Sequence, residues 1–237
     1  MGFFSDLKYN KTNFEAGGLI EELTSRADKP MVKVPTEFIA PRKIDSRDMC
    51  LSSSNQLSTP HCAGYSTAGY IEYHNWKTLH YPAQVDGDAI YAQAKKIDGN
   101  STPGTTLKSA IKAAVDLKFI NGIGRYVDYP SVNSSNLDRM DKRIISIKFA
   151  LHQYGVVLAG FQITDEWDYV EKGTGIIRDM GDNAKRRGGH AVLLCGYSSD
   201  GVYIQNSWGD WGHYGFATLG WLQYNKQLMQ AMIIAPS

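Results

Sequence analysis

The stretch 188–208, GGHAVLLCGYSSDGVYIQNSW, sets one histidine between two glycines and an apolar run. The apolar run and the GVYIQNSW that follows have the β-branched and aromatic content of strands, and the Ser-Ser-Asp-Gly between them indicates a turn. His190 therefore stands at the start of one strand and Asn206 on the next. A lone histidine in such a place is usually a hydrogen-bonded group without chemistry, so the rest of the chain decides its meaning.

The fold class follows from the order of the remaining patterns. Before residue 156, four segments carry apolar residues at helical spacing or end at a glycine, which predicts helices: 62–79, 88–99, 105–119 and 139–155. After it come short pieces typical of strands: 156–163, 175–178, 190–198, 201–208, 214–222 and 230–236. Helices first and strands second predict an α+β fold, with a helical lobe against a largely antiparallel sheet.

Composition excludes several classes of function. The chain has 237 residues, 43% of them hydrophobic, and a formal net charge of +1, which gives no argument for a nucleic-acid partner. It contains no apolar run of membrane-spanning length. The start, MGFFSDLKYN, does not have the pattern of a secretory signal. We therefore expect a cytoplasmic protein that binds neither nucleic acid nor membrane, with export by a signal-independent route left open.

The cysteine and histidine counts argue against a scaffold of disulfides or metals. Three cysteines, Cys50, Cys62 and Cys195, allow at most one disulfide, and a reducing compartment is the simpler reading. There is no Cys-x-x-Cys pair and the histidines are scattered, so we expect no metal site and no cofactor. Four histidines have no matching partners and are predicted to be surface or satisfied groups: His74, His80, His152 and His213. The basic run at 185–189 is predicted to be a solvated loop.

Cys62 is the first residue of the first predicted helix, and this position favours a reactive thiol. A helix N-terminus or an imidazolium partner lowers the pKa of a thiol from about 8.5 by several units. His190 is suited to hold the thiol proton and to deliver it to a leaving amine. The side-chain oxygen of Asn206 can accept the other ring N–H and fix the imidazole. The competing reading is that Cys62 is a small core residue.

The same arrangement contains groups suited to an oxyanion and to a peptide. The side-chain amide of Gln56 and the backbone N–H of Cys62 are two donors for the oxyanion that forms when a carbonyl is attacked. Two glycines before His190 would let a substrate backbone pass close to the imidazole. A tryptophan beside the imidazole and Asn206 would keep water from their hydrogen bond.

Three blocks of this sequence resemble the active-site blocks of the papain-like cysteine peptidases: NQLSTPHCAGYSTA, GGHAVLLCGY and YIQNSWGDWGHYGFATL. They occur in the family's order of Gln, Cys, His and Asn, and IDSRD matches the Asp-x-Arg at the start of the mature domain. GTTLKSAIKAA adds a likeness to bacterial members that lack the disulfide ladder. The resemblance covers about residues 44–220. It implies a two-lobe fold, with a helical left lobe, an antiparallel sheet or barrel as the right lobe, and the site in the cleft between them.

The resemblance also implies roles for single residues. Cys62 would be the nucleophile, His190 the base and acid, Asn206 the orienting residue and Gln56 the oxyanion donor. The positions expected at the substrate are Gly104, Gly189 and Trp208. Two departures are expected to affect efficiency and specificity more than fold. Pro-His-Cys-Ala replaces the usual Gly-Ser-Cys-Trp, and a single residue separates Gly209 from Trp211 where the family has two.

The predicted function is that of a cysteine endopeptidase that cleaves peptide bonds through a thioester acyl-enzyme. Its partner would be a peptide or protein substrate, and a monomer is expected. Two other classes remain open: a weak or inactive peptide-binding module on the same fold, and a thiol amidase or acyl transferase. Residues 41–237 would form the peptidase domain. The lead segment 1–40, too polar for a core of its own, is expected to fold near the cleft and limit access.

Overall fold

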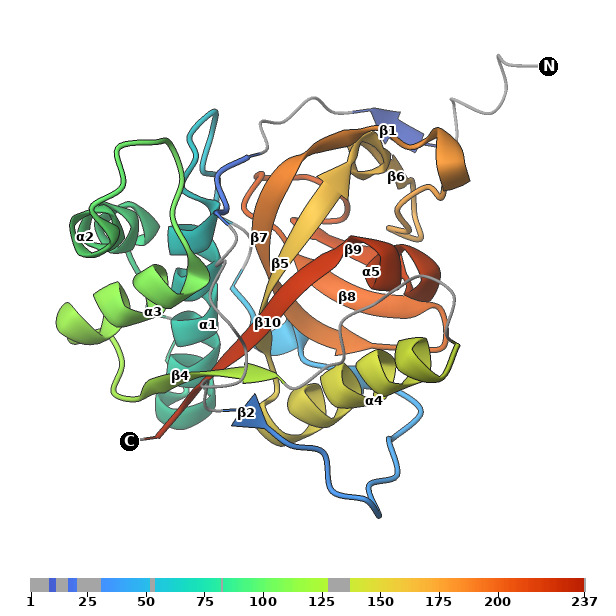
Figure 1. Ribbon diagram of the computed structural model, residues 1–237, viewed down its shortest axis with the longest axis horizontal. Coiled ribbons are helices and arrows are strands. Elements are labelled where there is room, and N and C mark those ends of the chain that lie inside the picture. The colour runs from blue at the N-terminus through green and yellow to red at the C-terminus, as the bar shows by residue number, and fades with distance from the viewer. Residues whose placement is uncertain are drawn as a thin grey trace.

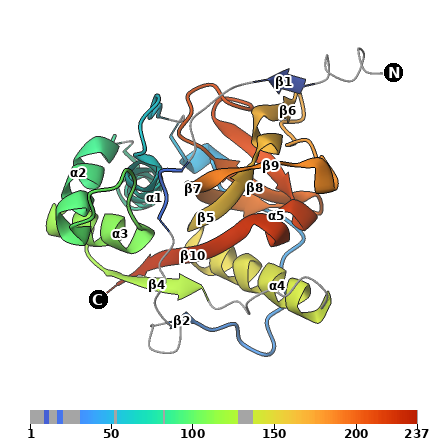
Figure 2. The same cartoon turned by 45° about the horizontal axis from the view of Figure 1, so that its top comes forward.

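A computed structural model describes residues 9–11, 17–20, 31–51, 54–81, 83–127 and 137–236. A group of three helices lies on one side of a long twisted sheet, and a fourth helix, α4 (Leu137–Tyr154), lies on the other (Figure 1). The expected α+β arrangement of a helical lobe against a largely antiparallel sheet is confirmed. The view in Figure 2 shows the same separation between the helical side and the sheet.

The three helices of the first lobe begin and end close to the predicted positions. They are α1 (Cys62–Leu79), α2 (Gly87–Asp98) and α3 (Leu107–Asp116). Asp86 and Thr106 cap the second and third helices with side-chain oxygens, which accept backbone N–H groups of the first turn. Gly99 ends α2 with a φ of 61°, in the left-handed region that glycine adopts without strain.

The main sheet has eight strands, seven of them in the order β2-β4-β10-β5-β7-β8-β9, with β3 pairing β7 beside this path. All pairings are antiparallel except that of β2 with β4. The strands are β2 (Met31–Val32), β3 (Ile44–Asp45), β4 (Ile123–Val127), β5 (Val157–Thr164), β7 (Arg186–Tyr197), β8 (Gly201–Gln205), β9 (Phe216–Gly220) and β10 (Leu228–Ala235). A second sheet pairs β1 (Tyr9–Lys11) with β6 (Tyr169–Glu171). Short 3-10 turns lie at Arg47–Met49, Asp165–Asp168 and Gly181–Asn183.

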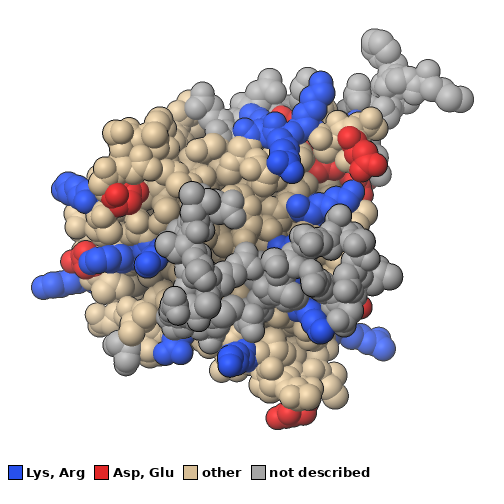
Figure 3. Space-filling view, in the orientation of Figure 1, with Lys and Arg blue, Asp and Glu red and all other residues tan. Residues whose placement is uncertain are grey.

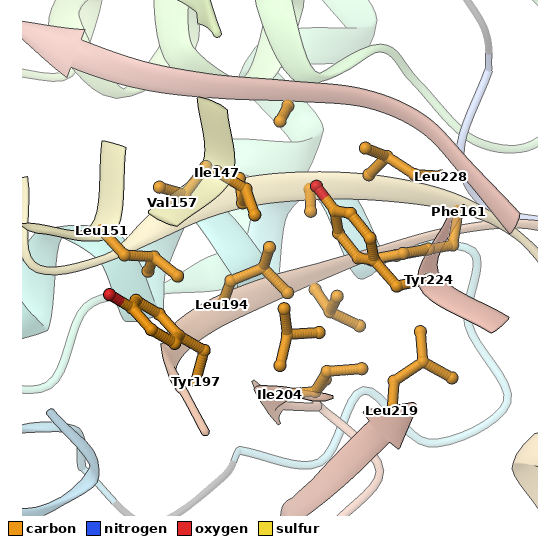
Figure 4. Close-up of a cluster of buried hydrophobic side chains, with 14 of the residues drawn as sticks. Ile147, Leu151, Val157, Phe161, Leu194, Tyr197, Ile204, Leu219, Tyr224 and Leu228 are labelled. Atoms are coloured by element: carbon orange, nitrogen blue, oxygen red, sulfur yellow. The ribbon is translucent and has the colours of Figure 1, made fainter. Parts of the chain in front are cut away.

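The central strands are buried on both faces, because each face covers a separate core. Along β7, Val192 and Leu194 face the core shared with α4 and the short helix α5 (Trp221–Gln227). Leu193 and Cys195 face the core shared with α1 and α3. Figure 4 shows the first of these cores, in which side chains from two helices, α4 and α5, meet side chains from β5, β7, β8, β9 and β10. A strand that is buried on both faces needs apolar side chains at nearly every position, as in the HAVLLC of β7.

Four predictions about single segments are wrong, each for a local reason. The basic run at 185–189 is not a solvated loop, because Arg186–Gly189 extend β7 and pair with β5. Residues 175–178 make only isolated bridges. Residues 221–227 turn into α5 instead of continuing a strand. His74 is not a satisfied surface group, because it lies between the rings of Tyr70 and Tyr73 and its Nε2 has no partner among the described residues.

None of the helices in the described part of the chain has the length and apolarity needed to span a membrane. Figure 3 shows one face of the molecule, on which some Lys and Arg side chains gather near the top and others are scattered.

Candidate active site

Cys62 is the first residue of α1 and is fully buried. Three backbone N–H groups, those of Cys62, Ala63 and Ala191, are placed to hydrogen-bond its sulfur. Two of them belong to the first turn of the helix, and the third belongs to the residue that follows His190 on β7. The sulfur therefore lies where the helical lobe meets the sheet.

The pKa of the Cys62 thiol differs from the expectation. Burial raises it to about 11, and the three backbone N–H groups only partly oppose that rise. The sequence predicted a lowered pKa from the helix N-terminus. In this structure the cost of moving a thiolate out of water outweighs the helix terminus, so the sulfur is held as the neutral thiol.

His190 and Asn206 meet as predicted. Nε2 of His190 lies 2.8 Å from Oδ1 of Asn206, and both residues are buried. The same oxygen accepts the backbone N–H of Ser207 at 2.8 Å, which directs the amide oxygen toward the ring. The backbone N–H of Asn206 donates to the carbonyl of Gly215 at 2.9 Å. Because the hydrogen bond uses Nε2, the opposite nitrogen, Nδ1, is left for other chemistry.

Tryptophans enclose the imidazole. Trp208 stacks on it with ring centroids 4.5 Å apart, and Trp167 meets it edge-on at 6.1 Å. Trp211 stacks on Trp167 at 5.8 Å and donates from its Nε1 to the Trp167 carbonyl at 2.8 Å. This enclosure lowers the pKa of His190 to about 4, since burial outweighs the opposing hydrogen bond to Asn206 and the charge of Arg187 lowers it further.

Trp208 was expected to contact the substrate, but in the structure it stacks on the imidazole of His190. Its ring is 1% exposed and covers the imidazole. The sequence analysis missed Trp167, whose Nε1 donates to Oε1 of Gln227 at 2.7 Å. The signal was weak, because Trp167 stands in a short Asp-Glu-Trp-Asp turn outside the matching blocks.

Two observations bring the thiol and the imidazole together. The Ala191 N–H lies close enough to the sulfur of Cys62 to lower the pKa of its thiol, and Ala191 directly follows His190. Nδ1 of His190 is buried and has no hydrogen-bond partner among the described residues. The unused ring nitrogen and the sulfur thus belong to neighbouring positions at one junction of α1 with β7.

Gln56 is tied to the residue that follows Asn206. Its backbone N–H donates to the Ser207 carbonyl at 2.9 Å, and the Ser207 hydroxyl donates to Oε1 of Gln56 at 2.6 Å. Nε2 donates to the Thr59 carbonyl at 2.6 Å, which uses one of its two hydrogens. The loop before α1 is therefore fixed to the strand side of the site. Its part in binding an oxyanion remains a prediction.

His61, which directly precedes Cys62, is held by α2. Its Nδ1 lies 2.7 Å from Oδ1 of Asp88, and its ring stacks on Tyr91 with centroids 3.8 Å apart. The Tyr91 hydroxyl in turn accepts the backbone N–H of Gly104 at 3.2 Å. The second titratable group beside Cys62 is thus part of a cluster that also anchors Gly104.

Residues 17–20 of the lead segment lie on the two glycines expected to pair with substrate. The Gly189 carbonyl accepts the N–H groups of Gly17 at 3.0 Å and of Leu19 at 3.2 Å. Thr105 donates its N–H to the Gly18 carbonyl at 3.1 Å, and its own carbonyl accepts the N–H of Ile20 at 3.0 Å. The segment forms a bridge between the two lobes.

The approach at this bridge is close enough to require glycine. A Cβ added to Gly104, whose φ is 90°, would lie 2.5 Å from the Gly18 carbonyl oxygen. A Cβ added to Gly189 would lie 2.4 Å from the Leu19 carbonyl oxygen. Leu19 itself is 5% exposed, and its Cδ2 lies over Gly160. Leu19 stands in a segment without strand or helix pattern, so the sequence analysis did not single it out.

Among the described residues, no group of three or more His, Cys, Asp and Glu side chains is placed to hold a metal ion.

Comparison with known proteins identifies the fold of this chain. The family model of papain family cysteine proteases matches residues 125–236, which include His190 and Asn206. No curated protein sequence matches the chain. Xylellain, a cysteine protease from Xylella fastidiosa, has a similar structure: 17% identity, TM-score 0.68, and coverage of 95% of this chain and 98% of that chain.

Two further solved structures give the same result. ProCathepsin B S9 from Trypanosoma congolense is 16% identical with a TM-score of 0.67, and the match covers 100% of this chain and 89% of that chain. Digestive procathepsin L 3 from Tenebrio molitor larval midgut is 19% identical with a TM-score of 0.61, and the match covers 96% and 76%. At these identities the likeness shows the fold. The resemblance to the papain-like cysteine peptidases is thus confirmed: the chain has their fold, and residues 125–236 match the model of the papain family of cysteine proteases.

Proposed function

We propose that this protein is a cysteine endopeptidase in which Cys62, His190 and Asn206 cleave peptide bonds through a thioester. The observation that supports it most is the pair of contacts around His190. Asn206 holds Nε2, and the backbone N–H of the residue after His190 lies close enough to the sulfur of Cys62 to lower the pKa of its thiol. A nucleophile, a base and a group that orients the base are the parts that nucleophilic catalysis requires.

In the proposed reaction, the sulfur of Cys62 gives its proton to Nδ1 of His190 and attacks the peptide carbonyl carbon. The oxyanion that forms accepts hydrogen bonds from the Cys62 backbone N–H and the Gln56 side chain. His190 then protonates the leaving amine and the C–N bond breaks, leaving a thioester. Water gives a proton to His190 as it attacks this thioester, which releases the acid and restores the thiol.

We also propose that the lead segment 1–40 limits access to this site in the domain formed by residues 41–237. Residues 17–20 hydrogen-bond to Gly189 and Thr105, where a substrate backbone is expected. Both reacting side chains are fully buried in this state, and burial keeps the thiol and the imidazole neutral. Withdrawal of the segment would let water reach the pair and favour the thiolate and the imidazolium.

One observation favours a second function. A neutral thiol with a pKa of about 11 is what a peptide-binding module without catalysis would show. A thiol amidase or acyl transferase would use the same residues as a peptidase, and the site geometry supports it equally.

The experiment compares Cys62→Ala with Cys50→Ser, a matched control in which a different cysteine is changed. Cys62→Ala should lose all hydrolysis of a fluorogenic dipeptide substrate, and a thiol-directed epoxide should no longer label residue 62, while Cys50→Ser keeps both the hydrolysis and the label on Cys62. Turnover that survives in Cys62→Ala would exclude the proposed mechanism. Adding an amine acceptor separates the alternatives, because a transferase would form the new amide in preference to the acid.

A further inference from the structure

The two cysteines outside the proposed site converge on one residue, Ser46. β3 pairs with β7 so that Asp45 lies opposite Gly196, and the backbone N–H of Ser46 donates to the Cys195 carbonyl at 2.8 Å. The 3-10 turn that follows brings Cys50 back, and its thiol donates to the Ser46 carbonyl at 3.3 Å. Two residues far apart in the sequence are thereby held on either side of the same short backbone segment.

The side chains of these cysteines also meet. The side chain of Cys50 lies close enough to the Cys195 thiol to raise the pKa of that thiol, and Cys50 packs against the core between α1 and the sheet, to which Cys195 belongs. Cys195 is fully buried on β7, and its thiol is near enough to donate to the Tyr203 carbonyl at 3.5 Å. Cys50 is partly exposed at the edge of this core. The Cys50 sulfur can therefore react with a reagent from solution, whereas the Cys195 sulfur is buried.

We propose that Cys50 and Cys195 are a disulfide-forming pair that reacts with a low-molecular-weight disulfide such as oxidised glutathione. This inference does not depend on the proposed peptidase function, because it uses neither Cys62 nor His190. Three cysteines allow a single disulfide within the chain. The proposal identifies this disulfide as Cys50–Cys195 and leaves Cys62 as the free thiol.

The reaction proceeds by thiol–disulfide exchange in two steps. Cys50 loses its proton and attacks one sulfur of oxidised glutathione, which forms a mixed disulfide and releases one glutathione thiolate. The deprotonated Cys195 then attacks the Cys50 sulfur and releases the second glutathione. The protein gives up two electrons and two protons, and oxidised glutathione becomes two reduced molecules. Burial raises the pKa of the Cys195 thiol, so Cys50 meets the oxidant first.

The bridge would have a measurable effect on the fold. It would join the segment just before the Gln56 loop to β7, and the closed ring would contain α1, α2, α3 and α4. A cross-link that closes a long loop restricts the unfolded chain, so the oxidised protein should melt several degrees higher than the reduced protein.

The test uses the full chain with Cys62→Ala, so that only the proposed pair can react. After incubation with oxidised glutathione, the expected product has lost the mass of two hydrogen atoms and shows no free thiol on denaturation. Its digest should contain residues 50 and 195 in one linked peptide. Two titratable thiols after oxidation, a lasting glutathione adduct on Cys50, or a link between two chains would each overturn the proposal.

The control adds Cys50→Ser to the same background. This variant keeps the buried Cys195 and should show no mass loss and no rise in melting temperature on oxidation. If it melts higher after treatment by as much as the parent does, the rise does not come from the bridge and the proposal fails.

Discussion

The imidazole and the thiol of the candidate site are held in different ways. His190 is fixed by permanent parts of the sheet lobe, through the hydrogen bond to Asn206 and the rings of Trp208 and Trp167. The Cys62 sulfur lies near three backbone N–H groups, close to the place where residues 17–20 cross between the lobes. One half of the site is thus organised by the core, and the other lies buried near the crossing that residues 17–20 make.

The largest expected effect lies on the imidazole side. His190→Ala removes the group that takes and returns the proton, and kcat/KM for a fluorogenic dipeptide should fall by about 10³-fold or more. Asn206→Ala leaves the imidazole in place but unoriented, and we expect a smaller loss, on the order of 100-fold. Steady-state kinetics on both variants checks this order. An Asn206→Ala variant as active as the wild type would show that the 2.8 Å contact does not position the base.

On the thiol side, a single substitution in the lead segment should be enough to change the activity. A Cβ added to Gly18 would lie 2.6 Å from the Pro60 carbonyl oxygen, so Gly18→Ala should push the segment away from the site. If that clash costs 1–2 kcal/mol of segment binding, activity on small peptides should rise roughly tenfold.

The matched control for Gly18→Ala is Ile39→Ala, in the same lead segment but 89% exposed. It should leave the rate unchanged. Unchanged or lower activity in Gly18→Ala would count against the segment as a barrier to substrate.

Burial of the imidazole also predicts a dependence of stability on pH. The pKa of His190 is about 4 in the folded state and about 6.5 in the unfolded state, so the unfolded chain binds more protons between these values. The free energy of unfolding should therefore fall as pH drops from about 6.5 to about 4, by on the order of 3 kcal/mol from this residue. His74, also lowered to about 4 by burial, acts in the same direction.

Urea unfolding at several pH values measures this dependence. His190→Gln should lose its share of the slope, and His213→Gln, on the exposed surface, should keep the wild-type slope. Equal slopes in all three proteins would mean that the buried imidazole does not titrate with a lowered pKa.

The smallest expected effect concerns the aromatic enclosure. Trp167→Phe keeps a ring beside the imidazole but loses the 2.7 Å hydrogen bond to Gln227, whose oxygen loses that donor. We expect a loss of about 1–2 kcal/mol in the free energy of unfolding. Thermal or urea melting measures it, and a loss of activity much larger than the loss of stability would show that Trp167 also positions His190.

The sequence predicted the parts of this arrangement that rest on local pattern. Helix boundaries followed from Thr106 and Gly99, and the strand carrying His190 followed from its apolar run. The contacts that depend on the whole fold could not be read in this way. Trp167 reaches His190 only because β5 and β7 pair, and β4 forms through its pairing with β10. The pKa of Cys62 is raised, not lowered as predicted, because burial by residues distant in the sequence outweighs the effect of the helix N-terminus.

The central claim is that the imidazole of His190 controls the reactivity of the Cys62 thiol. The most direct test is the pH dependence of Cys62 alkylation by iodoacetamide in Gly18→Ala, with and without His190→Ala, followed by mass spectrometry of the Cys62 peptide. With His190, the alkylation rate should rise at a pH well below the ordinary thiol pKa of about 8.5, and without it the rise should move to alkaline pH. Two superimposable curves would contradict the claim.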